Sequence, residues 1–191
     1  MPNLYTGKGD NGTTYVFDTP KGTRISKASG LIEALGSLDE LNSYLGLCKV
    51  EAAKWNYVVN DSKQKWYLQE IVHDIQDDLF IIQAELAGAN KKIAAGKVKK
   101  LEKWISLIEK TLPPITTFFI SGGTELSSRF DYARTLARQA ERRLVLIIEA
   151  DERKLGRSTI SYMNRLSSVL YALARYSNHI FGAGETAPSY K

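Results

Sequence analysis

The sequence predicts an all-α protein, a five-helix bundle with ferritin-like up-down packing that follows a glycine-rich irregular segment. Three observations support this prediction. The 191 residues suit one domain, since domains commonly run to about 100–200 residues. The composition, 43% hydrophobic and 25% charged, is typical of a globular protein with a packed core. All five prolines lie outside the five long segments in which apolar residues recur every three or four positions, as in amphipathic helices that pack into a bundle.

The first two predicted helices cover residues 35–55 and 62–88. Ser37 followed by Glu40 has the spacing of a capping box and marks the expected start of the first helix. The second ends near Gly88 and has an expected length of about 40 Å at 1.5 Å per residue. The inward positions of the first helix are Leu35, Leu38, Leu41, Leu45 and Cys48.

The third predicted helix covers residues 96–111 and ends before Pro113. A fourth begins near Thr124 or Glu125, and a fifth opens at Ser158 or Thr159. Residues 13–17 have the composition of a short strand. We therefore expect a single domain over 1–191, divided into an N-terminal segment (1–30), a helical bundle (31–180) and a frayed tail (181–191).

The charge balance and the cysteine count narrow the class of protein. A formal net charge of +5 favours an anionic partner but does not distinguish nucleic acid, nucleotide and lipid headgroup. Cys48 is the only cysteine, which excludes an internal disulfide and a multi-cysteine metal site and fits a reducing compartment. No apolar run approaches the roughly 18 residues of a membrane span, and the first residues lack the apolar region of a signal peptide. We expect a cytoplasmic protein without membrane contact.

Residues 6–14, TGKGDNGTT, are rich in glycine and threonine. Gly7, Gly9 and Gly12 match G-x-G-x-x-G, but no buried strand precedes them and no helix follows, so a dinucleotide-binding fold is not indicated. A P-loop is excluded because no lysine follows Gly12. Two interpretations remain open. The segment is either a flexible N-terminal stretch or a run of exposed amides that wraps a polyphosphate together with Lys8.

Three arginines in the fourth predicted helix form a stripe. Arg134, Arg138 and Arg142 recur every four residues, with Glu141 beside the last of them. Guanidinium groups stacked along one helix face suit phosphate oxygens, although a solvated basic face paired with Glu141 is the plainer interpretation. Asp39, in the first helix, is an acidic residue that could meet this stripe if a second helix or a second subunit packs against it.

Other polar positions carry less information. Asn164 and Arg165 follow the inward Met163 in the fifth helix, a position at which a polar group can face an interface or ligand. Glu70 and His73 form one half of the E-x-x-H pattern of di-iron bundles, but the second half is missing. The chain also offers no Cys/His or Ser-His-Asp arrangement, so a covalent protein nucleophile is not indicated.

Six stretches of the chain, taken together, resemble the PduO-type ATP:cob(I)alamin adenosyltransferase family and occur in the family's order. They are YTGKGDNGTT (5–14), SK (26–27), EALGSLDELNSYLG (33–46), FFISGGTELSS (118–128), ARTLARQAERR (133–143) and MNRLSSVLYALARYSN (163–178). The resemblance implies a homotrimer of five-helix bundles with ATP and corrinoid bound between subunits. The chain departs from the family pattern at Leu31, Ser121, Gln139 and Ser168.

The resemblance also implies roles for individual residues. The segment that wraps ATP contains Thr6, Gly7, Lys8, Gly9, Asp10, Gly12, Thr13 and Thr14, and Lys27 contacts the triphosphate. Nucleotide and Mg²⁺ are held by Arg138, Glu141 and Arg142, with Glu141 as the metal ligand, and Asn164 closes the site.

Two further roles concern the subunit contact and the corrin. Asp39 and Arg134 match an intersubunit salt bridge beside the site. Phe118 matches the aromatic residue at the lower face of the corrin, with the adjacent Phe119 as the alternative. The catalytic set implied by the resemblance is therefore Phe118, Asp39, Arg134 and Arg138.

The implied reaction transfers the 5′-deoxyadenosyl group of ATP to the cobalt of cob(I)alamin and releases triphosphate. A cob(II)alamin reductase and a cobalamin-dependent acceptor enzyme are the implied partners. Two alternatives from other classes remain, namely a non-catalytic corrinoid or nucleotide carrier and a basic nucleic-acid-binding bundle.

Overall fold

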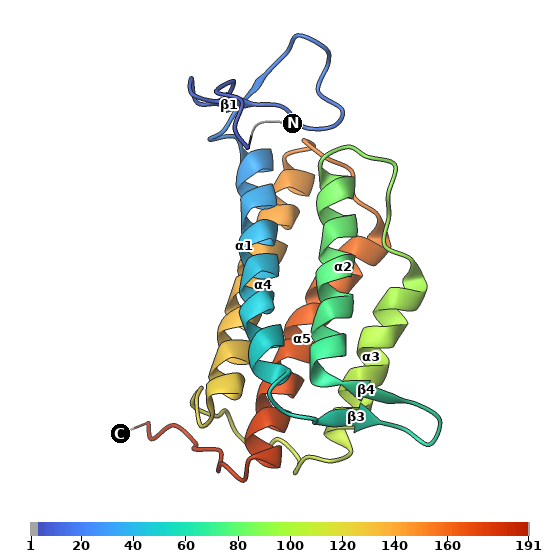
Figure 1. Ribbon diagram of the computed structural model, residues 1–191, viewed down its shortest axis with the longest axis vertical. Coiled ribbons are helices and arrows are strands. Elements are labelled where there is room, and N and C mark those ends of the chain that lie inside the picture. The colour runs from blue at the N-terminus through green and yellow to red at the C-terminus, as the bar shows by residue number, and fades with distance from the viewer. Residues whose placement is uncertain (1–3, 191) are drawn as a thin grey trace.

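The computed structural model describes residues 4–190 and confirms the predicted five-helix bundle (Figure 1). The helices are α1 (Gly30–Ala52), α2 (Leu68–Leu86), α3 (Ala95–Glu109), α4 (Glu125–Glu149) and α5 (Arg157–Ile180). Two short antiparallel pairs accompany them, β1 (Thr13–Thr14) with β2 (Ile25–Ser26), and β3 (Val58–Asn60) with β4 (Lys65–Tyr67).

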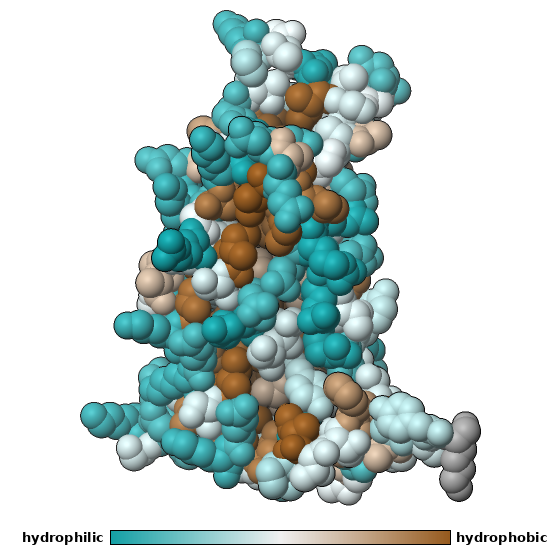
Figure 2. Space-filling view, turned by 180° about the vertical axis from the view of Figure 1, so that it is seen from behind, coloured by the Kyte–Doolittle hydropathy of each residue, from teal (hydrophilic) through white to brown (hydrophobic). Residues whose placement is uncertain are grey.

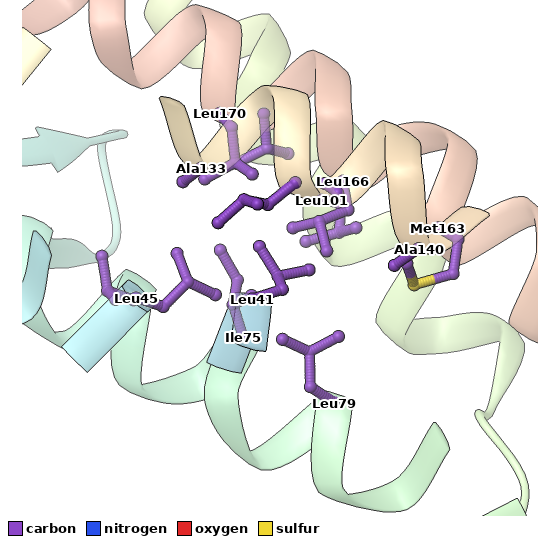
Figure 3. Close-up of a cluster of buried hydrophobic side chains, with 14 of the residues drawn as sticks. Leu41, Leu45, Ile75, Leu79, Leu101, Ala133, Ala140, Met163, Leu166 and Leu170 are labelled. Atoms are coloured by element: carbon purple, nitrogen blue, oxygen red, sulfur yellow. The ribbon is translucent and has the colours of Figure 1, made fainter. Parts of the chain in front are cut away.

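The core lies between helices that run side by side, with α1 packed on α2 and α4, and α5 packed on α3 and α4. Figure 3 shows labelled leucines of α1, α2, α3 and α5 in one cluster with alanines of α4. Full burial of one such leucine contributes roughly 1.5–3 kcal/mol, and the small alanines let α4 approach its neighbours closely. The labelled residues, all fully or almost fully buried, are Leu41, Leu45, Ile75, Leu79, Leu101, Ala133, Ala140, Met163, Leu166 and Leu170.

The predicted start of the first helix is wrong by five residues. Ser29 is the N-cap of α1, and its side chain accepts a hydrogen bond from the amide of Ile32. Ser37 is buried inside the helix, where its hydroxyl donates to the carbonyl of Ala34 at 2.8 Å. The apolar series of α1 extends back to Leu31. Gly30 and Gly36, which lie on either side of Leu31, are poor helix formers and made this part of the helix difficult to predict.

The predicted start of the second helix is also wrong, because residues 58–67 form the hairpin β3–β4. Trp66, which fits the apolar series of a helix, is buried from a strand instead, under the ammonium group of Lys103. The helix begins only after Tyr67, whose amide donates to the carboxylate of Glu70 at 3.0 Å. Its 19 residues span about 28 Å, not about 40 Å.

The other helix starts agree more closely with the sequence. The predicted start of α4 near Thr124 or Glu125 is confirmed: Thr124 is the N-cap, and its hydroxyl accepts from the amide of Ser127 at 3.1 Å. Thr159 does not open α5, which begins at Arg157. Its hydroxyl and the amide of Gly156 both donate to the buried carboxylate of Glu85, at 2.5 and 2.8 Å. A carboxylate from α2 therefore satisfies the amino end of α5.

The two ends of the bundle carry different segments. Figure 1 shows the N-terminal segment with β1 at one end, and the β3–β4 hairpin, the α3–α4 connection and the C-terminal tail at the other. The tail is not frayed throughout, since the amide of Ile120 donates to the carbonyl of Thr186 at 2.8 Å. Among the described residues, no helix has the length and apolar character needed to span a membrane.

Candidate functional site

The glycine-rich N-terminal segment is folded back on itself. Gly7 and Gly12 have φ values of 66° and 77°, in the left-handed region that glycine adopts without strain. Lys27, in the chain after β2, donates from its backbone amide to the carbonyl of Gly12 and from its side-chain nitrogen to that of Gly9, both at 2.9 Å. The structure thus brings Lys27 to residues 6–14, although 18 residues separate it from Gly9.

Arg24 is a residue of this segment that the sequence analysis missed. Its guanidinium donates to the hydroxyl of Thr13 at 2.6 Å and to the carbonyl of Thr13 at 2.7 Å. Thr13 is also tied to Asn11, whose side-chain oxygen accepts from the Thr13 hydroxyl at 2.6 Å. The only sequence signal is a cation near a glycine-rich run. The segment therefore presents Lys8 and Asp10 as exposed groups on a hydrogen-bonded loop.

The arginine stripe lies on the surface of α4. Arg138 and Arg142 are exposed, and within residues 4–190 neither forms a salt bridge. Arg134 is half-buried and pairs with Asp131 of its own helix at 3.1 Å. Eight residues of helix separate Arg134 from Arg142, which is about 12 Å along the axis. The stripe is therefore a row of cations with two members available to an anion.

Glu141 and Asn164 come together from different helices. The side-chain amide of Asn164 on α5 donates to Glu141 Oε1 on α4 at 3.1 Å. Arg165 donates to the oxygen of Asn164 at 2.8 Å and to Glu102 of α3 at 3.1 Å. This chain of contacts orients the Asn164 amide toward Glu141. Glu102 was missed in the sequence, because nothing there shows that α3 and α5 pack together.

Two adjoining hollows border the N-terminal part of the arginine stripe, at Arg134 and Arg138. One of about 330 Å³ lies between α3, α4 and α5 and is lined by Arg134, Arg138 and Tyr171. The other, of about 610 Å³, is lined by Arg134, Tyr171, Phe118 and Phe119. They share Ile115, Arg134 and Tyr171, so they form one continuous surface. Tyr171 was not singled out from the sequence; partial burial raises the pKa of its phenol.

A third hollow, of about 530 Å³, borders the other end of the stripe and is lined by Arg142 together with Gly30 and Leu146. Gly30 is where the N-terminal segment joins α1. Arg142 therefore lies toward the glycine-rich segment, whereas Arg134 lies toward Phe118. Figure 2, the view from behind, shows hydrophobic patches toward both ends of the bundle among mostly hydrophilic residues.

Phe118 and Phe119 have different surroundings. Phe118 is 78% exposed and lines the 610 Å³ hollow. The Phe119 ring is half-buried and stacks against the guanidinium of Arg175, 5.1 Å from the ring centroid. Of the two, Phe118 is the ring free to contact a ligand from outside the chain.

The predicted pair of Asp39 and Arg134 joins two subunits, so a single chain does not test it. Asp39 is exposed on α1, and Arg134 is paired with Asp131, so the two predicted partners are not in contact within one chain. Among residues 4–190 no group of three or more His, Cys, Asp or Glu side chains is arranged to hold a metal. Glu141 therefore fits Mg²⁺ only in the common arrangement in which one carboxylate binds the ion and substrate phosphates supply further ligands.

Comparison with known proteins gives a consistent result. The family model described as cobalamin adenosyltransferase matches residues 4–177. The chain is 37% identical over 183 residues to corrinoid adenosyltransferase PduO of Citrobacter freundii, covering 92% of this chain and 50% of that protein. It is 34% identical over 182 residues to another corrinoid adenosyltransferase of Citrobacter freundii, covering 92% and 94%.

A solved structure is similar over nearly the whole chain. It is a variant of a PduO-type ATP:corrinoid adenosyltransferase from Lactobacillus reuteri in complex with cobalamin and ATP, with a TM-score of 0.84 and 27% identity, covering 98% of this chain and 97% of that one. The chain spans about half the length of the PduO relatives that it matches. With the family model matched over residues 4–177, the chain belongs to the cobalamin adenosyltransferase family.

Proposed function

We propose that the protein transfers the 5′-deoxyadenosyl group of ATP to the cobalt of cob(I)alamin, giving adenosylcobalamin and triphosphate. The observation that carries this proposal is the direction of the arginine stripe. Arg142, at the C-terminal end of the stripe, lines the hollow that includes Gly30, where the glycine-rich segment joins α1. Arg134, at the N-terminal end of the stripe, lines the hollow that Phe118 also lines. The two ends of the stripe, about 12 Å apart along α4, thus border a phosphate-binding region and an aromatic surface.

The nucleotide binds to the polar end of this arrangement. The glycine-rich loop of residues 6–14, with Lys8 and Lys27, surrounds the triphosphate, and Arg138 and Arg142 neutralise its charge. Glu141, oriented by Asn164, holds Mg²⁺ together with phosphate oxygens. When bound, Mg²⁺ supplies further charge neutralisation for the departing triphosphate. The similar Lactobacillus reuteri protein, whose structure is a complex with cobalamin and ATP, supports the proposal that this chain binds the same two ligands.

The chemical step needs little acid or base from the protein. The cobalt(I) of the substrate supplies the electron pair for a new Co–C5′ bond, the C5′–O bond breaks, and triphosphate leaves with that bonding pair. The protein must align cobalt with C5′ and stabilise the leaving charge. Arg138, Arg142 and Lys27 suit the second task because their charges are fixed before the reaction begins.

Phe118 acts on the lower face of the corrin. Its exposed ring lines the hollow, and in the proposed complex it fills the space that a lower ligand of the cobalt otherwise takes. Without that ligand, cob(II)alamin is easier to reduce to the nucleophilic cob(I) form, so Phe118 changes the electronics of the substrate and moves no proton.

We further infer a homotrimer with sites between subunits. Asp39 is exposed on α1 and is not paired with Arg134 of its own chain, so its pairing with the stripe of another subunit would be a heterologous contact, the type that forms a ring when the rotation closes. Asp39 of one subunit then pairs with Arg134 of the next. A cob(II)alamin reductase supplies the electron, and a cobalamin-dependent enzyme receives the product. The single cysteine fits a cytoplasmic location.

The test is direct. Purified protein is mixed with ATP, Mg²⁺ and chemically reduced cobalamin, and adenosylcobalamin is followed by absorbance while triphosphate is measured separately. We expect both products in equal amounts. A non-catalytic carrier would bind both substrates but leave ATP intact, and that result, with a known family member active in parallel, would disprove the proposal.

A further inference from the structure

Arg175 of α5 is a buried cation that no step of the proposed reaction uses. It is 6% exposed. Its guanidinium donates to both carboxylate oxygens of Glu185 in the C-terminal tail, at 2.6 and 2.7 Å, and to the carbonyl of Pro113 at 3.1 Å. The same guanidinium stacks on the Phe119 ring. A buried charge requires such partners, so Arg175 fixes the tail and the α3–α4 connection to one helix.

Asn178, one turn further along α5, fixes the other end of that connection. Its side-chain amide donates to the carbonyl of Gly122 at 2.8 Å, and its oxygen accepts from the amide of Thr124 at 3.1 Å. In the middle, the amide of Ile120 donates to the carbonyl of Thr186. Residues 113–124 are therefore held at both ends by α5 and at the centre by the tail.

Phe118 lies between these points of attachment. With 78% of the residue exposed, its side chain has little packing of its own to fix its position. The location of the ring relative to Arg134, across the hollow that both residues line, must therefore come from the backbone of residues 113–124. That backbone depends on the tail through Thr186 and on Arg175 through Pro113 and Phe119.

We propose that Arg175 and Glu185 are positioning residues, and that the C-terminal tail is a strap which holds Phe118 at the distance from Arg134 that the corrin requires. This inference rests on the proposed function. It assigns no contact with substrate to either residue. Misplacement of a reacting group by about 1 Å can cost on the order of 100-fold in rate, so a strap of this kind acts on turnover without binding anything itself.

Glu185→Gln is the most informative variant, because it keeps the shape of the side chain and removes the charge. It also leaves the helix intact, whereas truncating Arg175 would empty a buried position. Glu185→Asp restores the charge and is the rescue variant. Asp74→Asn is the matched control, since it removes the carboxylate from an ion pair of similar length, with Lys100 at 2.6 Å between α2 and α3.

Each variant is assayed with cob(II)alamin under reducing conditions and with pre-reduced cob(I)alamin, and thermal unfolding verifies the fold. For Glu185→Gln we expect kcat with cob(II)alamin to fall by about tenfold or more, with the KM for ATP unchanged. The absorption spectrum of bound cob(II)alamin should show a smaller fraction without its lower ligand, and the amide of Ile120 should exchange hydrogen faster. Glu185→Asp should recover much of the loss, and Asp74→Asn should behave as the parent protein.

Two outcomes would overturn the proposal. The first is faster hydrogen exchange at the Ile120 amide with unchanged kcat and an unchanged cob(II)alamin spectrum. This result would mean that the strap stabilises the fold but does not position Phe118 for the reaction. The other is an equal loss with both corrinoid forms together with a raised KM for ATP. Turnover by the parent protein tests the proposed function separately, because the strap is judged only by the ratio of the variant's kcat to the parent's kcat.

Discussion

Asn164 of α5 donates a hydrogen bond to Glu141 of α4 at 3.1 Å, and Arg165 fixes the direction of the Asn164 amide from the other side. The pair joins two helices next to the arginine stripe. A carboxylate that accepts a hydrogen bond from a fixed amide is held in one orientation. In the proposed site, that orientation is what directs Glu141 to Mg²⁺ and the phosphates.

Asn164→Ala should therefore weaken ATP binding. Hydrogen bonds to charged groups contribute about 1.5–3 kcal/mol, which corresponds to roughly a tenfold to hundredfold change. We expect the KM for ATP to rise by about tenfold, partly compensated by higher Mg²⁺. Initial rates at varied ATP and Mg²⁺ measure this. Asn90→Ala, at an exposed asparagine between α2 and α3, is the control, and equal kinetics for the two variants would contradict the role of Asn164.

Phe118→Ala should separate the two corrinoid forms. Loss of the ring removes the group that excludes the lower ligand, so we expect adenosylation of cob(II)alamin in a reducing coupled assay to slow far more than that of pre-reduced cob(I)alamin. Because Phe118 is 78% exposed, the free energy of unfolding should change little. Equal losses in both assays would argue against a role at the lower face.

Asp39→Asn tests the contact between subunits. Asp39 and Glu40 are adjacent and both exposed on α1, so Glu40→Gln removes a similar charge at nearly the same place. We expect only Asp39→Asn to weaken assembly or catalysis, because only Asp39 is proposed to pair with Arg134 of a neighbouring subunit. Sedimentation at several concentrations and steady-state rates measure the two effects, and an unchanged trimer with unchanged rates would refute the pairing.

Gly123→Ala should destabilise the segment that carries Phe118. Gly123 has φ 108°, and an added Cβ would lie 2.6 Å from the Asn178 side-chain oxygen. We expect a loss of about 1–3 kcal/mol in the free energy of unfolding from backbone strain alone, measured by urea titration. Gly96→Ala, in α3, is the control: apart from its chain neighbours and the backbone of its own helix, nothing lies within 4 Å of the new Cβ. It should be neutral or stabilising by up to about 1 kcal/mol.

Cys48 should be unreactive in the folded protein. The thiol is fully buried, and desolvation raises its pKa to about 12. Alkylation requires the thiolate, which forms only as the pH approaches that value, so we expect negligible labelling by iodoacetamide at pH 8 in native buffer and rapid labelling in urea. Mass spectrometry after timed quenching measures both. Rapid labelling of the native protein would show that the α1 core opens readily.

The sequence predicts the helices well where one apolar stripe continues through the element, and poorly at their starts. The start of α4 near Thr124 is predicted correctly because the residues that cap a helix are a local feature of the sequence. Ser37 misleads because a capping-box spacing also occurs inside a helix. The prediction for residues 58–67 is wrong for a different reason. Burial of Trp66 is compatible with a helix or a strand, and only packing of the hairpin on α3 decides between them.

By itself the sequence determined the five-helix bundle and the arginine stripe, because a helical period of 3.6 residues places Arg134, Arg138 and Arg142 on one face wherever the helix packs. Only the tertiary structure decided which distant groups meet. Lys27 reaches Gly9, Asn164 reaches Glu141, and Glu185 reaches Arg175. These contacts depend on how loops close and on which helices are neighbours, and no local spacing encodes either.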